Sequence, residues 1–174
     1  EGECAAPPRP APSPSERSRD FEQLSWWVSI ERSMTAERWR EAQDLISAHR
    51  TEEAPLSDAR FYLEVRRIAA LADNGHSNAS EGPIYDHFGL IPLRVYWFSD
   101  GPFIVRAAES FQHLLGARID AVDGIAIGDL MRELKEFHGG SEGFFRHYSA
   151  ASLMLSPPLL HAVGLGESRH DLTL

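Results

Sequence analysis

Apolar residues recur at helical spacing through the first half of the chain, which predicts short amphipathic helices there. The first helix is expected over 20–32, and a second should start after Thr35, whose hydroxyl can cap it. The residues that form their apolar stripes are Phe21, Leu24, Trp27 and Val28 in the first helix and Trp39, Ala42 and Ile46 in the second. Because such stripes must be buried against one another, this half should form a small helical unit.

A third helix carries the clearest boundary signals. Ser57 is a good N-cap, and Leu56 and Phe61 stand at the spacing of a hydrophobic staple around that cap. Asn74-Gly75 is typical of a helix end. The expected apolar face of this helix consists of Phe61, Val65, Ile68 and Ala72.

After Pro83 the pattern changes to alternation. Residues 93–98 alternate as a strand does, 99–101 can form a hairpin turn, and 103–105 should return as the second strand. The other expected elements are a short helix over 109–115, a strand over 117–122, a helix over 127–137, helical structure over 144–155 that Pro157-Pro158 ends, and the opening of a strand over 171–174.

These patterns predict an α+β fold, in which an N-terminal helical unit is followed by a small mixed sheet with helices. The expected organisation is a proline-rich disordered tail over 1–19, the helical unit over 20–82, a sheet-containing domain over 83–140, and a helical connection with the start of a following domain over 141–174. Because the chain stops on a strand-like segment that would leave an unpaired edge, we expect it to be truncated inside a longer protein.

Composition and charge narrow the function classes. A net charge of -9 argues against a nucleic-acid partner, and no apolar run approaches the roughly 20 residues that cross a bilayer. The single cysteine, Cys4, can form neither an intrachain disulfide nor a thiolate metal cluster. A lipid on Cys4 is one alternative, but the residues before it lack the required apolar run, so an inert thiol in an unstructured tail is favoured.

Three segments carry a resemblance to a known family. Residues 71–77 close a helix with Asp-Asn-Gly-His-Ser, 91–98 enter a strand, and 116–131 run from a strand through Asp123-Gly124 into a helix. The last segment resembles the final strand and following helix of a PDZ-like domain. The order of all three resembles the N-terminal part of tail-specific (C-terminal processing) serine peptidases, over about 20–170 of this chain.

The resemblance implies that the domain over 83–140 is PDZ-like and binds peptides. Such modules add an extended peptide as a strand and hold its terminal carboxylate with backbone N–H groups of a loop. The residues that these roles would fall on are Gly89, Leu90 and Ile91 in the loop and Phe103, Ile104 and Val105 in the strand. Pro92 departs from the family pattern because it removes one N–H donor. A PDZ-like fold that only packs against its neighbours is the alternative.

Two local patterns have ordinary interpretations. Residues 139–143 match Gly-x-Ser-x-Gly, but a nucleophile elbow needs an entering strand, and here a helix precedes Ser141, so we interpret the match as coincidence. Asp73 and His76, with an Asp-His pair at 86–87, could be read as a metal site, yet their spacing fits no known pattern. We therefore expect a structural loop at Asp73 and His76, and no metal or other cofactor.

The first functional hypothesis is that the chain is the substrate-recognising portion of a serine-type peptidase. Such a hydrolase carries out proteolysis, and its substrates would be peptide or protein C-termini. The resemblance places its serine and lysine on a later α/β domain, so no catalytic residue is expected here, and Lys135 should lie on a solvated helix face. The second hypothesis is a non-catalytic PDZ-like peptide-binding or scaffold module. The acidic chain should prefer partners that are apolar or basic near their C-terminus, and an extracytoplasmic location (periplasmic, secreted or surface-anchored) is expected.

Overall fold

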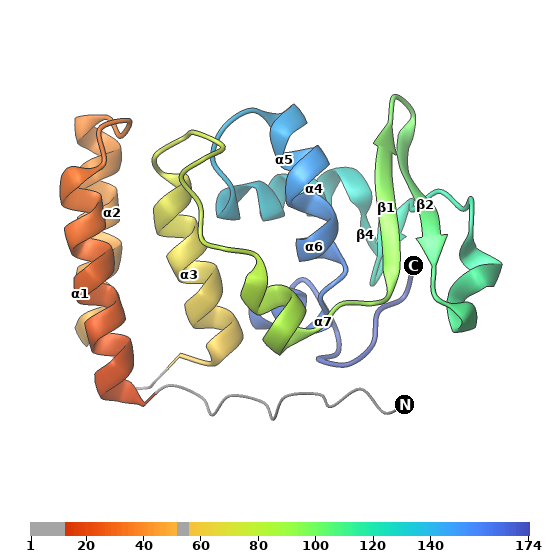
Figure 1. Cartoon of the computed structure of the whole chain (residues 1–174), viewed down its shortest axis with the longest axis horizontal. Coiled ribbons are helices and arrows are strands. Elements are labelled where there is room, and N and C mark those ends of the chain that lie inside the picture. The colour runs from red at the N-terminus through yellow and green to blue at the C-terminus, as the bar shows by residue number, and fades with distance from the viewer. Residues whose placement is uncertain (1–12, 52–55) are drawn as a thin grey trace, which may run out of the picture.

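The computed structural model describes residues 13–51 and 56–174, and it has the predicted α+β fold (Figure 1). The expected tail up to residue 12, including Cys4, lies outside the described residues. The helices α1 (Pro14–Ile30) and α2 (Ala36–Thr51) lie side by side at one end of the molecule, and a β-hairpin forms the other end. Between them lie α3 (Asp58–Ala70) and the C-terminal helices. No helix of the described part is long and apolar enough to cross a bilayer.

The helix α1 begins earlier than its apolar stripe indicates. Ser13 caps it, because its hydroxyl accepts the N–H of Glu16 at 3.3 Å while the Glu16 carboxylate accepts the N–H of Ser13 at 2.7 Å. Pro14 occupies the first turn, where its missing N–H has no cost. Residues 14–19, which we expected in the disordered tail, are therefore helical because a capping box starts the helix without apolar residues.

The predicted caps of the next two helices are confirmed. The Thr35 hydroxyl accepts the N–H of Arg38 at 3.2 Å at the start of α2, and the Ser57 hydroxyl accepts the N–H of Arg60 at 3.2 Å at the start of α3. The buried surface of α3 differs from the predicted apolar face, because Ile68 and Ala72 are buried as expected while Phe61 and Val65 are only half-buried. Its buried residues are Tyr62, Leu63, Glu64, Arg66, Ile68 and Ala69. The helix is buried on more than one side because it lies between α1–α2 and the C-terminal half (Figure 1).

The hairpin joins β1 (Leu93–Phe98) to β2 (Gly101–Ala107) in antiparallel register, as the alternation predicts. A second antiparallel pair, β3 (Ala121–Val122) and β4 (Ile125–Ala126), surrounds the Asp123-Gly124 turn. The expected strand over 117–122 is shorter, but its first residues lie beside β2 through a bridge between Phe103 and Arg118. The remaining elements of this half are the π-helix η1 (Ile84–Phe88), the 3-10 helices η2 (Glu109–Leu114) and η3 (Lys135–Phe137), and α4 (Ile127–Leu134).

The C-terminal helices are α5 (Glu142–Tyr148), α6 (Ala150–Met154) and α7 (Pro157–Ala162). Pro157 starts α7 instead of only ending the preceding helix, because proline suits the first helical turn. The segment 171–174 is not a strand. Thr173 nevertheless pairs with the β3–β4 turn, since its carbonyl accepts the Asp123 N–H at 2.8 Å.

Two apolar clusters hold these elements together. One joins α1, α2 and α3 through Phe21, Val28, Ala42, Ile46, Ile68 and Leu71. The larger cluster joins α3, the strands and the C-terminal helices, and it includes Leu63, Ile104, Val122, Leu130, Leu153 and Leu160. Because α3 contributes to both clusters, it fixes the helical unit to the rest of the molecule.

Candidate functional site

A pocket of about 650 Å³ lies beneath the tip of the β-hairpin, against α4 and α5. We call it the hairpin groove. Its apolar lining consists of Trp97, Phe98, Pro102, Ile127, Met131 and Phe145. Gly128, also in the lining, has open space where a Cβ would stand. The volume falls within the range of roughly 300–1,000 Å³ that is usual for ligand sites.

The helix α4 forms one wall of the groove because it carries two apolar stripes. Leu130 and Leu134 are buried in the core, and Ile127 and the largely buried Met131 line the groove. Lys135 follows at the same four-residue spacing and also lines the groove, so it does not lie on a fully solvated face as we expected. The sequence signal for the groove was this second stripe, which the core stripe obscured.

Charged side chains form the rim of the groove. Arg146 lies over the Trp97 ring, 5.4 Å from its centroid, and forms an ion pair with Glu142. Arg132 pairs with an aspartate one helical turn earlier, and Lys135 Nζ donates to the carbonyl oxygen of His138 at 2.5 Å. Three cations and one carboxylate thus line a groove in a chain of net charge -9.

The strand β1 is an edge strand, because its only partner among the described strands is β2. The last residues of β1, Trp97 and Phe98, line the groove. Beyond β2, β1 has no strand partner in the described part of the chain, although α5 and α6 also contact it.

The loop expected to hold a carboxylate lies at the start of β1, away from the groove at its end. Two of its three N–H donors are already used, since the Gly89 N–H donates to Ile84 O at 2.9 Å and the Ile91 N–H donates to Leu155 O at 2.9 Å. The Gly89 carbonyl accepts the Ser156 hydroxyl at 3.0 Å. Among the three loop residues, all within the described part, only Leu90 has an N–H without a backbone partner, so the loop offers few donors to a carboxylate.

The candidate strand residues are also occupied within the chain. The Ile104 N–H donates to Ala117 O at 3.0 Å, and Ile104 O accepts the Gly116 N–H at 2.9 Å. Phe103 and Val105 line a second, open depression of about 570 Å³, which shares Phe98 with the hairpin groove. An added peptide strand therefore meets the 116–117 segment at Ile104.

Asp73 and His76 lie in a structural loop after α3. An Asp73 carboxylate oxygen accepts the Gly140 N–H at 3.1 Å, and the His76 ring lies 6.2 Å from the Phe144 ring. The residue that organises the loop is Asn74, whose side-chain oxygen accepts the N–H groups of His76 at 3.0 Å and Ser77 at 2.8 Å. The two expected residues thus stabilise the contact between the two halves of the molecule.

Gly139 and Gly140 complete this contact. A Cβ on Gly139 would lie 2.9 Å from Ala70 O, and one on Gly140 would lie 2.7 Å from Gly75 N. Gly140 also has φ +81°, which disfavours any side chain. Ser141 then caps α5 by accepting the Phe144 N–H at 3.2 Å. The 3-10 helix η3, and not a strand, precedes it, so the context of a nucleophile elbow is lacking.

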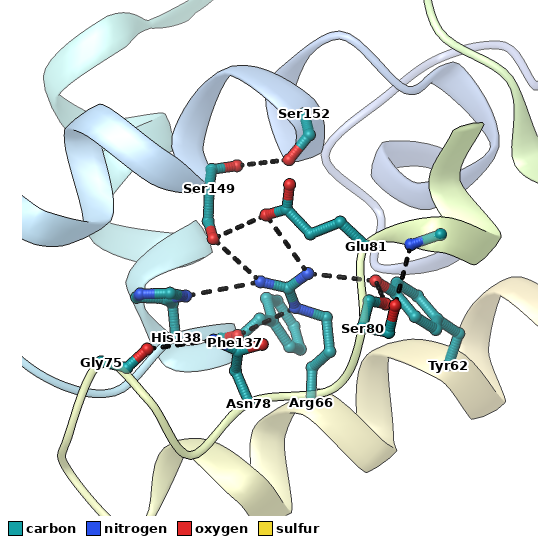
Figure 2. Close-up of polar contacts among 11 residues, drawn as sticks. Tyr62, Arg66, Gly75, Asn78, Ser80, Glu81, Phe137, His138, Ser149 and Ser152 are labelled. Atoms are coloured by element: carbon teal, nitrogen blue, oxygen red, sulfur yellow. Dashed lines mark hydrogen bonds and ion pairs between the residues drawn. The ribbon is translucent and has the colours of Figure 1, made fainter.

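A buried polar cluster is centred on the fully buried Arg66 of α3 (Figure 2). Its Nε donates to Phe137 O at 3.2 Å and its Nη1 to the Tyr62 hydroxyl at 3.0 Å. Its Nη2 lies 3.3 Å from the Ser149 hydroxyl and 3.4 Å from His138 Nδ1. The guanidinium therefore has a partner in each direction of its fork.

The charge of Arg66 is balanced by Glu81, whose carboxylate lies 3.8 Å from Nη1 (Figure 2). The Ser149 hydroxyl donates to the same Glu81 oxygen at 2.7 Å. Because Ser149 serves as a link between two charged groups, its role here is structural. The cluster joins α3, the loop before η1 and α6, which explains why an arginine is buried in α3.

His138 is held in its neutral form. Its Nδ1 faces an Arg66 donor, so Nδ1 accepts and the proton lies on Nε2. Burial, with the nearby charges of Arg66 and Lys135, lowers the pKa of His138 to about 4. Its ring stacks on Phe144 with 5.6 Å between ring centroids.

Among residues 13–51 and 56–174, no group of three or more His, Cys, Asp or Glu side chains is arranged to hold a metal ion. No protein-family model matches the chain, and comparisons with curated proteins and with solved structures gave no significant match.

Proposed function

We propose that this chain is a peptide-recognition module, whose hairpin groove binds an extended and largely apolar segment. The observation that carries this proposal is the apolar pocket beside the edge strand β1. A peptide that lies along this edge pairs its backbone groups with those of β1. Its alternate side chains then enter the pocket formed with α4 and α5.

The resemblance to tail-specific serine peptidases supports a more specific role. In that setting the bound segment is a substrate, and the module presents it to a serine and a lysine on another domain in an extracytoplasmic compartment. The described residues favour recognition over chemistry, because Lys135 Nζ bonds a carbonyl and Ser141 caps a helix. The alternative is a scaffold module that binds peptides and never cleaves them. A serine and lysine pair encoded downstream of Leu174 would favour the peptidase.

Two glycines provide a matched test of the groove. Gly128 and Gly143 each occupy the second position of a helix and have open space where a Cβ would stand, but only Gly128 lines the groove. Gly128→Leu should fill the pocket and weaken binding of a labelled decapeptide of alternating Leu and Ser by at least ~10-fold, about 1.4 kcal/mol. Gly143→Leu should bind this peptide like the parent chain.

Both substitutions should leave the fold intact, since replacing a helical glycine by leucine favours the helix by roughly 0.5–1 kcal/mol. Fluorescence anisotropy gives the affinities, and thermal unfolding checks the fold. Equal binding by both variants and the parent would show that the groove is not the site. Equal binding of the free and C-terminally amidated peptide would argue against carboxylate capture.

A further inference from the structure

Lys135 differs from the other cations of the hairpin groove in how its charge is balanced. Arg132 and Arg146 each form an ion pair with a carboxylate on their own helix. In the part of the chain that the structure describes, Lys135 forms no ion pair, and Nζ donates one bond to His138 O at 2.5 Å. An ammonium group has three N–H donors, so two remain for a ligand.

An apolar groove strengthens the interaction between a cation in its wall and the carboxylate of a bound ligand. The groove excludes part of the surrounding water, and a charge-assisted hydrogen bond formed there is roughly twice as strong as a neutral one. The acidic character of the whole chain opposes this only at long range, where salt screens charges beyond about 10 Å. The local charges of the groove therefore decide which peptides it accepts.

A second hollow shows that a bound chain need not end at Lys135. This hollow of about 360 Å³ lies between α2, α3 and η3, and Arg132 and Lys135 line it as well as the hairpin groove. The two cations thus stand between two adjoining hollows. A peptide in the groove therefore has room to continue past them, and a side chain within the segment can then bring its carboxylate to Lys135.

We propose that Lys135 binds the side-chain carboxylate of a Glu or Asp inside the bound peptide, and that the groove selects apolar segments with one acidic residue. This inference rests on the proposed peptide-binding function. It replaces the expectation of apolar or basic partners, which considered only the net charge of the chain and not the three cations of the groove.

The test is a scan of labelled decapeptides of alternating Leu and Ser, in which each Ser in turn is replaced by Glu or by Gln. At one position, Glu should bind ~10-fold more tightly than Gln, and this preference should shrink when salt rises from about 50 mM to about 0.5 M. Lys135→Met should abolish the preference, so that the Glu and Gln peptides bind it equally. Lys135→Arg should keep it, because the charge remains.

Arg106→Met serves as the matched control, because Arg106 is exposed on β2 and lies outside the groove lining. This variant should keep the preference for Glu.

Peptides that bind without any difference between Glu and Gln would overturn the role of Lys135 and leave peptide recognition standing. If amidation of the C-terminus abolishes binding but replacement of Glu by Gln does not, the bound carboxylate is that of the chain end. That result would overturn the inference. Absence of binding by every peptide would overturn both proposals. If Lys135→Met fails to fold, the proposal is still tested by comparing the Glu and Gln peptides on the parent chain and on Lys135→Arg.

Discussion

Arg66 Nε donates to the carbonyl oxygen of Phe137 at 3.2 Å, although the two residues are 71 positions apart in the chain. Arg66 belongs to α3, and Phe137 ends the 3-10 helix that follows α4 directly. Since α4 is a wall of the hairpin groove, this bond fixes the position of the groove relative to the helical unit.

Arg66→Met should destabilise the protein strongly. Methionine fills much of the same volume. However, the partly buried Glu81 then has no cation beside it, and Phe137 O loses its hydrogen-bond donor. We expect a loss of about 3–5 kcal/mol in the free energy of unfolding, measured by urea denaturation.

Arg67→Met is the matched control for that measurement. Arg67 is the next residue of α3, is partly exposed, and lies 3.8 Å from the exposed Glu136. Its replacement should cost less than about 1 kcal/mol. Similar losses for the two variants would contradict the structural role assigned to Arg66.

Stability should fall in mild acid because of His138. Its pKa in the folded protein is lowered to about 4, below the value of about 6.5 in an unfolded chain, so the unfolded state takes up the proton first. The contribution of this residue is complete above about pH 6.5 and is lost as the pH falls toward 4, with a total on the order of 3 kcal/mol.

The measurement is the free energy of unfolding across that pH range for the parent chain and for His138→Asn. The asparagine variant should lose less stability in acid, because its side chain does not titrate. His113→Asn, at an exposed position, should retain the pH dependence of the parent. The idea fails if His138→Asn and the parent lose stability in parallel.

Gly140→Ala should be far more costly than Gly143→Ala. At Gly140 a Cβ meets the backbone nitrogen of Gly75 at 2.7 Å and φ is +81°, so we expect a loss of about 1–3 kcal/mol. Gly143 has open space in a helix, and alanine there should stabilise by up to about 1 kcal/mol. Chemical denaturation of the two variants side by side gives the comparison, and a neutral Gly140→Ala would disprove the close approach.

Ser141→Ala should remove a helix cap and nothing else. Loss of the bond from the Phe144 N–H predicts a decrease of about 0.5–2 kcal/mol in stability, and Ser141→Asp should restore most of it. Peptide binding should not change in either variant. Peptide hydrolysis by the purified chain that disappears in Ser141→Ala would instead support a nucleophile at this position.

Local signals predicted the fold well where short-range chemistry decides it. The caps at Thr35 and Ser57 and the alternation over β1 depend on neighbours within a few residues, and the sequence displays them directly. The start of α1 was missed because its capping box at Ser13 and Glu16 lies before any apolar residue.

The candidate site could be predicted only in part, because it is built from distant segments. Periodicity assigns one buried face to a helix, whereas α3 lies between two layers and buries Arg66 on a second face. The donors of Gly89 and Ile91 are consumed by partners that the local sequence does not reveal, one of them Leu155. The groove depends on the approach of α4 to the hairpin, which no single segment encodes.

The glycines at the contact between the two halves also provide a way to recognise relatives of this protein. Apolar core residues can be exchanged for others of similar volume, but Gly139 and Gly140 face backbone atoms that cannot move aside. A distant relative that keeps this geometry should therefore keep an Asp-Asn-Gly segment after its third helix and, much later, a Gly-Gly pair followed by a capping residue. These two short segments can therefore be used together to search for relatives whose overall sequence similarity is too low to detect.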